Sequence, residues 1–291
     1  MGGTSSEKKV SLASGEAVVE ALREGGYEVV PVVLERDSLD GIKLDVEAVF
    51  IALHGGYGEN GGVQADLDRL GLPYTGPGAA SSRITMDKIA TKRVLEAAGV
   101  GTAPYAVLES GDERLPLPLP VVVKPPRDGS SVGVVKVTAE SGWKEPLRTA
   151  RAADPRGEDL VEQYIPGREW TVSLVGDRAL PVVEILAENG WYGFEEKYRS
   201  SATRYVFPEE AADRPLVERC QKLALAAFKA VGGRGVTRVD FRISPDGTPY
   251  VLELNTVPGL TSHSLLPKAA RRAGMSFSEL CSELITLAQC H

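Results

Sequence analysis

Two apolar runs near the C-terminus carry charged residues at matched spacing, and this feature limits the possible folds more than any other. The first run reads GVTRVDFRI and the second reads PYVLELN. Because side chains alternate across a strand, Arg238 and Asp240 should share one face of the first strand, and Glu253 and Asn255 one face of the second. The pattern predicts two neighbouring strands that present a polar face within an otherwise apolar sheet.

The residue types on this face indicate a metal and an anion. Carboxylate and amide oxygens are the hard ligands that Mg²⁺ prefers, and three of them leave coordination positions for phosphates and water. A lone acidic residue is usually solvated or ion-paired, but charged residues inside apolar strands are uncommon without a partner or a role. We therefore expect Asp240, Glu253 and Asn255 to hold a metal and Arg238 to stabilise a developing anion.

Two lysines and a glycine-rich loop suggest a site for phosphate. Lys88 lies at a predicted helix start in TMDK, and Lys124 ends the strand PVVVKP, just before the loop RDGSSVG. Glycine and serine in such a loop can turn backbone N–H groups and hydroxyls towards a phosphate. The loop alone is equally compatible with a hairpin turn, so the strand-end lysine carries the prediction.

The segment NTVPGLTSHSLLPKAA places hydroxyls and backbone donors before a short helix that begins near Ser264. A helix N-terminus with a hydroxyl suits a carboxylate. Taken alone, Ser264 is more typical of an ordinary N-cap than of a binding residue, and His263 of a structural capping residue.

Composition excludes several classes of function. The 291 residues are 43% hydrophobic and 25% charged, which is typical of a soluble globular protein of two or three domains. A formal net charge of -7 gives no general electrostatic reason to bind nucleic acid or an anionic membrane. Cys220, Cys281 and Cys290 lack metal or redox spacing, and we find neither a signal peptide nor an apolar span, so we expect a cytoplasmic protein.

Elsewhere the pattern alternates short helices and strands, as in α/β proteins. It predicts two N-terminal strands, at 28–34 and 46–53, the second ending at His54 and a glycine-rich loop. The polar segment 188–208 is long for a connection, which suggests a lid. The other predicted elements are helices at 13–24, 63–70, 82–98, 215–231 and from 276 onward, and the strands YAVLES, PVVVKP, SSVGVVKV, DLVEQYI, REWTVSLVG and ALPVVEILA.

These segments, in this order, resemble the D-alanine:D-alanine ligase family of the ATP-grasp superfamily. The matching motifs span nearly the whole chain: GGTSSEKKVSL, ALHGGYGENG, GLPYTGPG, TMDKIATK, VVVKPPRDGSSVG, EEKY, TRVDF and LELNTVPGLTSHSL. VVVKP occurs in many ATP-grasp enzymes, whereas LELNT-x-PG-x-TSHSL together with GGTSSE-x-x-VSL is specific to this ligase group.

The resemblance implies an α/β (α+β) ATP-grasp fold of three parts. Residues 1–80 would form a Rossmann-like substrate-binding domain and 81–165 a small central mixed subdomain. Residues 166–291 would form a C-terminal antiparallel-sheet domain with the lid at about 188–208. ATP would lie between the sheets of the central and C-terminal parts, and the protein would be a homodimer.

The resemblance also implies ligands for individual residues. Two Mg²⁺ ions, which Mn²⁺ could replace, would bind Asp240, Glu253 and Asn255. The residues implied to contact ATP are Lys88, Lys124, Ser131 and Lys197 at the phosphates, Glu162 and Glu169 at the adenine amine and ribose hydroxyls, and Tyr164, Ile165 and Trp191 around the adenine. Ile165 fits a plain core position as well.

The implied reaction joins two D-alanines for peptidoglycan synthesis. The first carboxylate attacks the γ-phosphate of ATP, and the amine of the second D-alanine attacks the resulting acyl phosphate. Arg238 and the backbone N–H of Gly259 would stabilise the tetrahedral oxyanion. The residues implied to contact the amino acids are Glu7, in a hydrogen-bonded chain to Ser130 and Tyr198, His54 near both substrates, and Ser264 with Leu265 at the second carboxylate.

Tyr198 in EEKY bears on the acceptor, because related ligases that accept D-lactate carry phenylalanine at the matching position. The tyrosine favours a dipeptide product over a D-alanine:D-lactate ligase, and another amino-acid ligase of the superfamily is a further alternative. A non-catalytic nucleotide-binding protein is an alternative of a different class. The joint presence of Arg238, Asp240, Glu253 and Asn255 argues against it.

The match departs from the family at its beginning. Family members have an apolar strand before GGTS, whereas this sequence begins Met1-Gly2-Gly3. Loss of an internal strand would leave neighbouring backbone groups unpaired and Glu7 poorly ordered. We therefore expect the natural chain to extend upstream.

Overall fold

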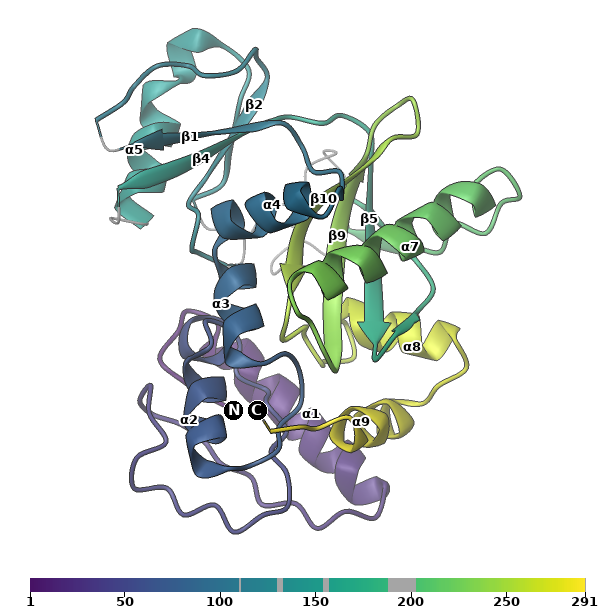
Figure 1. Cartoon of the computed structure of the whole chain (residues 1–291). Coiled ribbons are helices and arrows are strands. Elements are labelled where there is room, and N and C mark those ends of the chain that lie inside the picture. Colours follow the sequence, from purple (N-terminus) through teal and green to yellow (C-terminus); the bar gives the residue numbers. More distant parts are fainter. Residues whose placement is uncertain (110, 130–132, 154–156, 188–202, 291) are drawn as a thin grey trace.

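Two antiparallel sheets, one of four strands and one of six, form the framework of the protein (Figure 1). The structure is a computed structural model, and it describes residues 1–109, 111–129, 133–153, 157–187 and 203–290. Helices α3 and α4 lie between the two sheets in the same view, and α1 and α2 lie below them. None of the helices in the described ranges is long and apolar enough to cross a membrane.

The four-stranded sheet has the order β1-β4-β2-β3, and every neighbouring pair is antiparallel. Helix α5 covers one face through Leu147 and Ala150, which join Val121, Val123 and Val161 in one core. The sequence analysis did not predict α5. The bounds are β1 Tyr105–Glu109, β2 Val121–Lys124, β3 Val135–Val137, β4 Glu158–Gln163 and α5 Lys144–Ala153.

The six-stranded sheet has the order β10-β9-β5-β7-β8, with β6 paired to β5. Helix α7 covers its apolar face, where Trp170, Val172 and Phe241 pack against Ala224 and Phe228 (Figure 1). Strand β8 falls inside the segment predicted as a lid; residues 188–202 lie outside the described ranges. The bounds are β5 Arg168–Val175, β6 Arg178–Ala179, β7 Val183–Leu186, β8 Arg204–Val206, α7 Arg214–Ala230, β9 Val236–Ile243 and β10 Pro249–Asn255.

The N-terminal strands predicted at 28–34 and 46–53 are wrong as sheet strands. Residues 1–80, all of which the structure describes, form only isolated bridges: Gly2 with Leu34 and Val49 with Tyr74, both parallel, and Tyr74 with Gln289, antiparallel. Both segments line an apolar cavity of about 720 Å³. Their hydrophobic side chains therefore face the interior, as in strands, but the two segments do not pair with each other. The helices here are α1 Lys8–Glu24, η1 Gly56–Gly58 and α2 Gly62–Leu70.

The helix predicted at 82–98 is two helices, α3 Ala79–Met86 and α4 Lys88–Ala97, separated at Asp87. Asp87 adopts an extended backbone, and its carboxylate accepts the N–H groups of Ile89 and Ala90. An N-cap residue needs this non-helical conformation, so the cap itself breaks the helix. Lys88 is therefore the first residue of α4.

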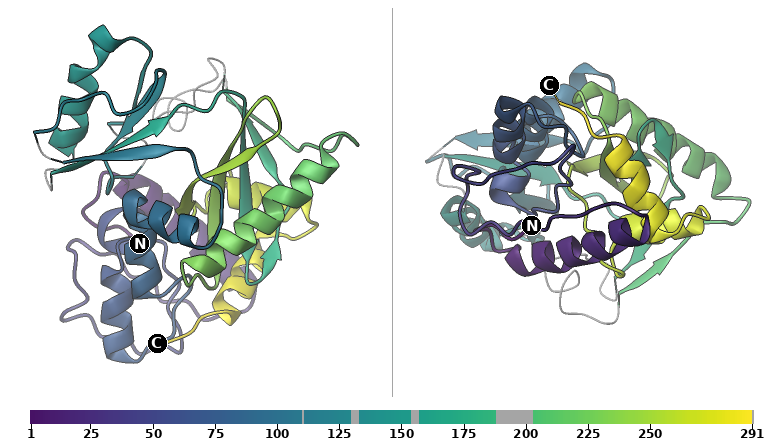
Figure 2. Two further views of the ribbon diagram at one scale, coloured as in Figure 1. Left: turned by 45° about the horizontal axis from the view of Figure 1, so that its top comes forward. Right: turned by 90° about the horizontal axis from the view of Figure 1, so that it is seen from below.

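The C-terminal helices α8 Leu265–Arg272 and α9 Phe277–Thr286 close the molecule against its N-terminal part. Figure 2 shows α9 beside α1, where the Ser278 hydroxyl donates to the carbonyl of Ala21 at 2.7 Å. Val18, Leu266 and Leu284 share one core. The second half of α1 is thereby held against α8 and α9.

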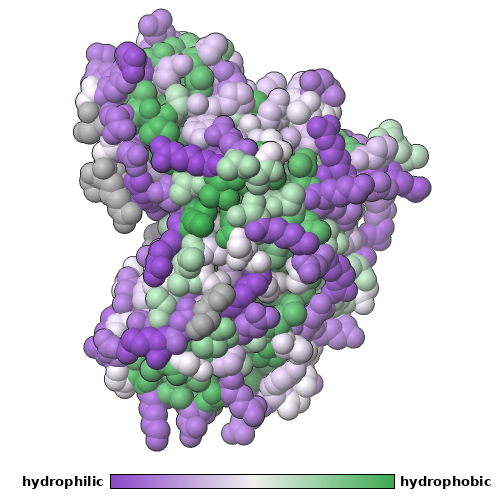
Figure 3. Space-filling model, in the orientation of Figure 1, coloured by the Kyte–Doolittle hydropathy of each residue, from purple (hydrophilic) through white to green (hydrophobic). Residues whose placement is uncertain are grey.

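Figure 3 shows hydrophilic residues (purple) over much of one face, with patches of hydrophobic residues (green) among them. Two of the three cysteines, Cys220 and Cys281, are fully buried, and burial raises the pKa of each thiol to about 12. Only Cys290 is exposed.

Thiol titration tests this arrangement. We expect a disulfide reagent at pH 8 to modify Cys290 rapidly in the folded protein, because the thiolate is the reactive form and the two buried thiols stay protonated. All three cysteines should react after denaturation in guanidinium. Fast modification of Cys220 or Cys281 in the folded protein would contradict the packing of α7 and α9.

Candidate active site

The face of the six-stranded sheet opposite α7 carries polar side chains on three adjacent strands. Asp240 on β9 lies directly opposite Glu253 on β10 and Thr171 on β5. One step along, Arg238 lies opposite Asn255. The structure therefore brings together the four residues that the sequence singled out on this face.

An irregularity in β10 produces this alignment. The register shifts between Val251 and Glu253, so one extra residue, Leu252, is accommodated there. A regular ladder would have set Leu252 opposite Asp240 and moved Glu253 away from it. Bulges of this kind often re-aim side chains at functional sites.

The Asp240 side chain is almost enclosed, and three hydrogen bonds hold its carboxylate in place. Arg238 donates from Nε and Nη2 to the two carboxylate oxygens, each at 2.8 Å. The Thr171 hydroxyl donates to Oδ1 at 2.7 Å, and Asp240 is 8% exposed. A bidentate pair of this geometry is strong and directional, so it fixes both partners.

The donor set suits Mg²⁺ if a ligand supplies the rest of the coordination shell. In the part of the chain that is described, no group of three or more His, Cys, Asp and Glu side chains could hold a metal by itself. Asp240 and Glu253 with the amide of Asn255 offer hard oxygen ligands, and Mg²⁺ is commonly held by one or two carboxylates together with phosphates and water. Asn255 also accepts the N–H of Val257 at 3.1 Å through Oδ1, which orients its amide.

A second charged group lies in the four-stranded sheet around Glu162. This carboxylate is 2% exposed and has one lysine on each oxygen, Lys124 at 2.5 Å and Lys92 at 2.9 Å. Burial would raise the pKa of Glu162, but the two lysines together hold it below its ordinary value. Glu162 and Lys124 were predicted from the sequence, and Lys92 was missed; its only signal is its place one turn after Lys88 in TMDKIATK.

Arg242 on β9 contacts the segment that links the two sheets. Its Nη1 lies 2.9 Å from Glu169 Oε2, and its Nε donates to the carbonyl of Ile165 at 3.1 Å. The ring of Tyr164 has the Lys136 ammonium 3.5 Å from its centroid. Tyr164 and Ile165 lie in the connection between β4 and β5, and Glu169 lies at the start of β5. Arg242, which was not predicted from the sequence, holds this segment to β9.

The loop after β2 is tied to the beginning of α4. Arg127 donates from Nε to Asp87 at 2.7 Å, and the Lys88 ammonium donates to the carbonyl of Asp128 at 2.5 Å. Lys88 thus lies against the loop that was predicted to bind phosphate. Five further predicted residues lie outside the described ranges: Ser130, Ser131, Trp191, Lys197 and Tyr198.

The Glu7 carboxylate lies where two glycine loops meet. Gly55 has a positive φ of 70°, and a Cβ there would lie 2.6 Å from Glu7 Oε2. A Cβ on Gly129 would lie 3.5 Å from the same oxygen. Only glycine at position 55 allows this approach. The start of α1, the loop after His54 and the loop after Lys124 therefore converge on Glu7.

His54 connects this region to the segment after β10. Its Nδ1 lies 3.0 Å from the carbonyl of Val257, and its Nε2 lies 2.9 Å from the Ser14 hydroxyl. The ring is 5% exposed. The backbone N–H of Leu260 also donates to Ser14, at 3.3 Å. His54 is thus a buried link between α1 and the segment that carries Gly259.

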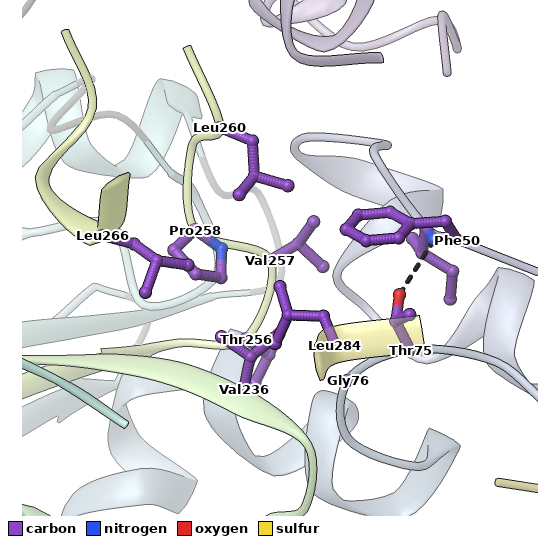
Figure 4. Close-up of a pocket in the computed structure, with 11 residues that line it drawn as sticks. Phe50, Thr75, Gly76, Val236, Thr256, Val257, Pro258, Leu260, Leu266 and Leu284 are labelled. Atoms are coloured by element: carbon purple, nitrogen blue, oxygen red, sulfur yellow. Dashed lines mark hydrogen bonds between the residues drawn. The ribbon is translucent and has the colours of Figure 1, made fainter. Parts of the chain in front are cut away.

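Residues 256–260 pack closely on the N-terminal part. Figure 4 shows Val257 between Pro258 and Phe50. The backbone N–H of Ile51 donates to the Thr75 hydroxyl at 3.0 Å. The cavity among these side chains is only about 10 Å³, roughly the room needed for one water molecule. This packing fixes the position of Gly259.

Gly259 and Ser264 are neighbours at the start of α8. A Cβ on Gly259 would lie 2.7 Å from Ser264 Oγ. Ser264 occupies the N-cap position, but its side chain makes no cap bond and instead contacts the hydroxyl of Thr261 at 2.9 Å. The side-chain N-cap bond expected of Ser264 taken alone is therefore not formed.

Two antiparallel sheets, with the buried Glu162 and its two lysines at one and Asp240 opposite Glu253 on the other, define an ATP-grasp protein. A family model described as "D-ala D-ala ligase C-terminus" matches residues 94–286. Together with the relatives described next, this match shows that the chain belongs to the D-alanine–D-alanine ligase family.

Curated relatives and solved structures agree over the whole chain. The D-alanine–D-alanine ligase of Desulforudis audaxviator is 44% identical, with 99% of this chain and 97% of the relative covered. That of Bordetella petrii is also 44% identical, covering 99% and 90%. The D-alanine–D-alanine ligase structure from Bacillus anthracis has a TM-score of 0.87 at 37% identity, covering 99% and 95%. The VanG D-Ala:D-Ser ligase structure from Enterococcus faecalis has 0.85 at 28%, covering 99% and 97%.

Proposed function

We propose that this protein joins two D-alanines at the expense of ATP, through a D-alanyl phosphate. The observation that carries the proposal is the register that sets Asp240 opposite Glu253 and Arg238 opposite Asn255. The curated relatives at 44% identity carry the name D-alanine–D-alanine ligase, which supports the choice of substrate. The dipeptide would feed peptidoglycan synthesis in the cytoplasm, and the protein would act as a homodimer.

Mg²⁺ fits the face formed by β9 and β10, where Asp240, Glu253 and Asn255 would hold it; two ions are implied by the resemblance, with Mn²⁺ able to replace them. Bound there, it would neutralise charge on the phosphate oxygens of ATP. Arg238 would remain as the fixed cation of this face. Its guanidinium cannot lose its proton at physiological pH, so it is suited to an oxyanion that forms only transiently.

ATP would lie between the two sheets. Lys88 and Lys124 would contact its phosphates, and Glu162 and Glu169 its adenine amine and ribose hydroxyls. Tyr164 and Ile165 would line the adenine. The Bacillus anthracis relative has also been solved in complex with ATP, at a TM-score of 0.85 and 36% identity, which supports this co-substrate. Ser131, Trp191 and Lys197 keep the roles that the resemblance implies.

The chemistry needs no covalent bond to the protein. A carboxylate oxygen of the first D-alanine attacks the γ-phosphorus, and ADP leaves. The neutral amine of the second D-alanine then attacks the acyl carbon, its surplus proton is lost, and inorganic phosphate leaves with the attacking carboxylate oxygen. Arg238 and the N–H of Gly259 would stabilise the oxyanion of the second step.

The amino acids would be held by the N-terminal part and by α8. Glu7 would pair with the first ammonium, in a chain with Ser130 and Tyr198, while His54 would support the adjoining loop. Ser264 and the N–H of Leu265 would bind the second carboxylate. The uncapped N-terminus of α8 supports this role, because its N–H groups and dipole favour an anion.

A matched pair of serines tests the role of Ser264. Ser264→Ala should raise the KM for the acceptor D-alanine by about tenfold, the cost of one hydrogen bond to a charged group, and change stability little. Ser276→Ala should do the reverse, because Ser276 forms a complete capping box with Glu279; we expect a loss of about 1 kcal/mol in the free energy of unfolding and an unchanged KM. Steady-state kinetics and urea unfolding measure both. Unchanged acceptor KM in Ser264→Ala would remove Ser264 from the site.

Phosphate release tests the proposed reaction. The protein is incubated with ATP, Mg²⁺ and D-alanine, with L-alanine alone and with D-alanine plus D-lactate as comparisons, and products are identified by mass. We expect phosphate and D-alanyl-D-alanine in equal amounts with D-alanine alone. A depsipeptide formed preferentially with D-lactate would instead support the D-lactate alternative, and no phosphate release with any D-amino acid would contradict the ligase assignment.

A further inference from the structure

Lys92 is a buried cation that the proposed reaction does not yet use. It lies in the middle of α4 with 1% of its surface exposed, among the least accessible lysine positions possible. Its ammonium is 2.9 Å from Glu162 Oε1, while Lys124 is 2.5 Å from Oε2. A fully buried lysine is rare unless it is paired, so this contact accounts for its position.

The two lysines differ in how firmly they are held. In addition to its ion pair with Glu162, the Lys92 ammonium donates to the Thr102 hydroxyl at 2.6 Å and to the carbonyl of Ala103 at 3.2 Å. Thr102 in turn donates to the carbonyl of Val251 on β10 at 2.8 Å. Lys92 is therefore held directly by β4 of one sheet and, through Thr102, by β10 of the other. Lys124 lies at the end of β2, and its side chain is 13% exposed.

The arrangement has a consequence for any movement of Lys124. Removing the only cation from a buried carboxylate is strongly destabilising, because the charge is left uncompensated in a medium of low polarity. With Lys92 in place, Glu162 keeps a counter-ion on one oxygen when Lys124 turns away from the other. Two cations on one carboxylate also leave one positive charge in excess, which favours an approaching phosphate.

We propose that Lys92 is a positioning residue of the nucleotide site, which keeps Glu162 charged and in place so that Lys124 can exchange that carboxylate for the phosphates of ATP. The proposal rests on the proposed function, in which Lys124 and Glu162 contact ATP. It adds that α4 contributes two lysines one turn apart with different tasks. Lys88 lies against the loop after β2, and Lys92 is the fixed counter-ion of Glu162.

Replacement of Lys92 by methionine, which has a similar length and no charge, tests this role. In Lys92→Met, Lys124 is the only partner of Glu162, so its transfer to ATP leaves a buried carboxylate unpaired. We expect the KM for ATP to rise at least about tenfold, and the Kd of a non-hydrolysable ATP analogue, measured by calorimetry, to rise in parallel. The KM for D-alanine should change less than twofold. If the methionine variant does not fold, Lys92→Gln takes its place. Glutamine keeps a hydrogen-bond donor but not the charge, so the same rise in the KM and Kd for the nucleotide is expected.

Arg151, on helix α5, provides a matched control, because its partner Asp159 is on the same strand as Glu162. It lies 2.6 Å from Asp159, which is fully buried on β4 three residues before Glu162 and therefore on the opposite face. Arg151→Met also takes a cation from a buried carboxylate, so it should destabilise the protein comparably and leave the KM for ATP unchanged. If Arg151→Met raises the KM for ATP as much as Lys92→Met, the role of Lys92 is merely structural and the proposal fails.

The same experiment separates this proposal from the proposed function. An unaltered protein that forms no dipeptide from ATP and D-alanine contradicts the ligase reaction itself. An active unaltered protein together with a Lys92→Met variant of normal KM and Kd for the nucleotide contradicts only the role of Lys92.

Discussion

Asp240→Asn is expected to lower kcat for dipeptide synthesis on the order of 10²- to 10³-fold, the usual cost of removing one electrostatic element from a polar active site. The amide would remove one charge from the proposed metal site but keeps an oxygen that can accept from Arg238 and Thr171. The fold should therefore survive. Phosphate release at saturating ATP and D-alanine measures kcat, and thermal unfolding followed by circular dichroism checks the fold.

Asp213→Asn is the matched control for this substitution. Asp213 also forms a two-bond pair with an arginine, Arg168, and its side chain is 16% exposed, against 11% for Asp240. It precedes α7, away from the face formed by β9 and β10. We expect its kcat to stay within about threefold of the unaltered protein, since the loss of a part-exposed ion pair is usually small. Similar kcat in the two variants would mean that the polar face is not the reaction centre.

Gly167→Ala is expected to lower the free energy of unfolding by about 3 kcal/mol or more, through backbone strain and overpacking together. Gly167 has φ +118° in the turn from β4 to β5, and a Cβ there would lie 2.0 Å from the carbonyl oxygen of Ile243. Neither group is a flexible side chain, so the turn would have to move. Because that turn follows Tyr164 and Ile165, we also expect weaker ATP binding in any protein that folds. Urea unfolding measures the stability.

Gly247→Ala separates strain from collision. Gly247 also has a positive φ, +81°, but a Cβ there would meet nothing within 4 Å. Only the conformational cost remains, about 1 to 2 kcal/mol for a side chain in this region. Equal losses in the two alanine variants would show that the turn at Gly167 is not as tightly packed against β9 as the structure has it.

The polar face could be predicted from the sequence because it depends on local alternation. Arg238 and Asp240 stand two residues apart in an apolar run, and the structure has them on one face opposite Asn255 and Glu253. The register between the strands was beyond prediction, because the irregularity after Val251 follows from pairing with β9 and has no mark in PYVLELN. The residue types on the face were foreseeable; their alignment was not.

Predictions that depended on distant partners were less successful. The runs at 28–34 and 46–53 have the apolar character of strands, but a strand needs a neighbour, and both flank a cavity instead. Lys92 was not predicted, because its partner Glu162 stands 70 residues further along the chain. Helix α5 was missed because Pro146 and many charged residues obscure its apolar stripe, although proline is tolerated in a first helical turn.

Transfer of oxygen from substrate to phosphate tests the central claim most directly. D-alanine labelled with ¹⁸O in both carboxylate oxygens is incubated with the protein, ATP and Mg²⁺, and the inorganic phosphate is analysed by mass spectrometry. Activation of the carboxylate as an acyl phosphate predicts one ¹⁸O atom in each phosphate released with dipeptide. Phosphate without the label, or AMP and pyrophosphate as products, would contradict it.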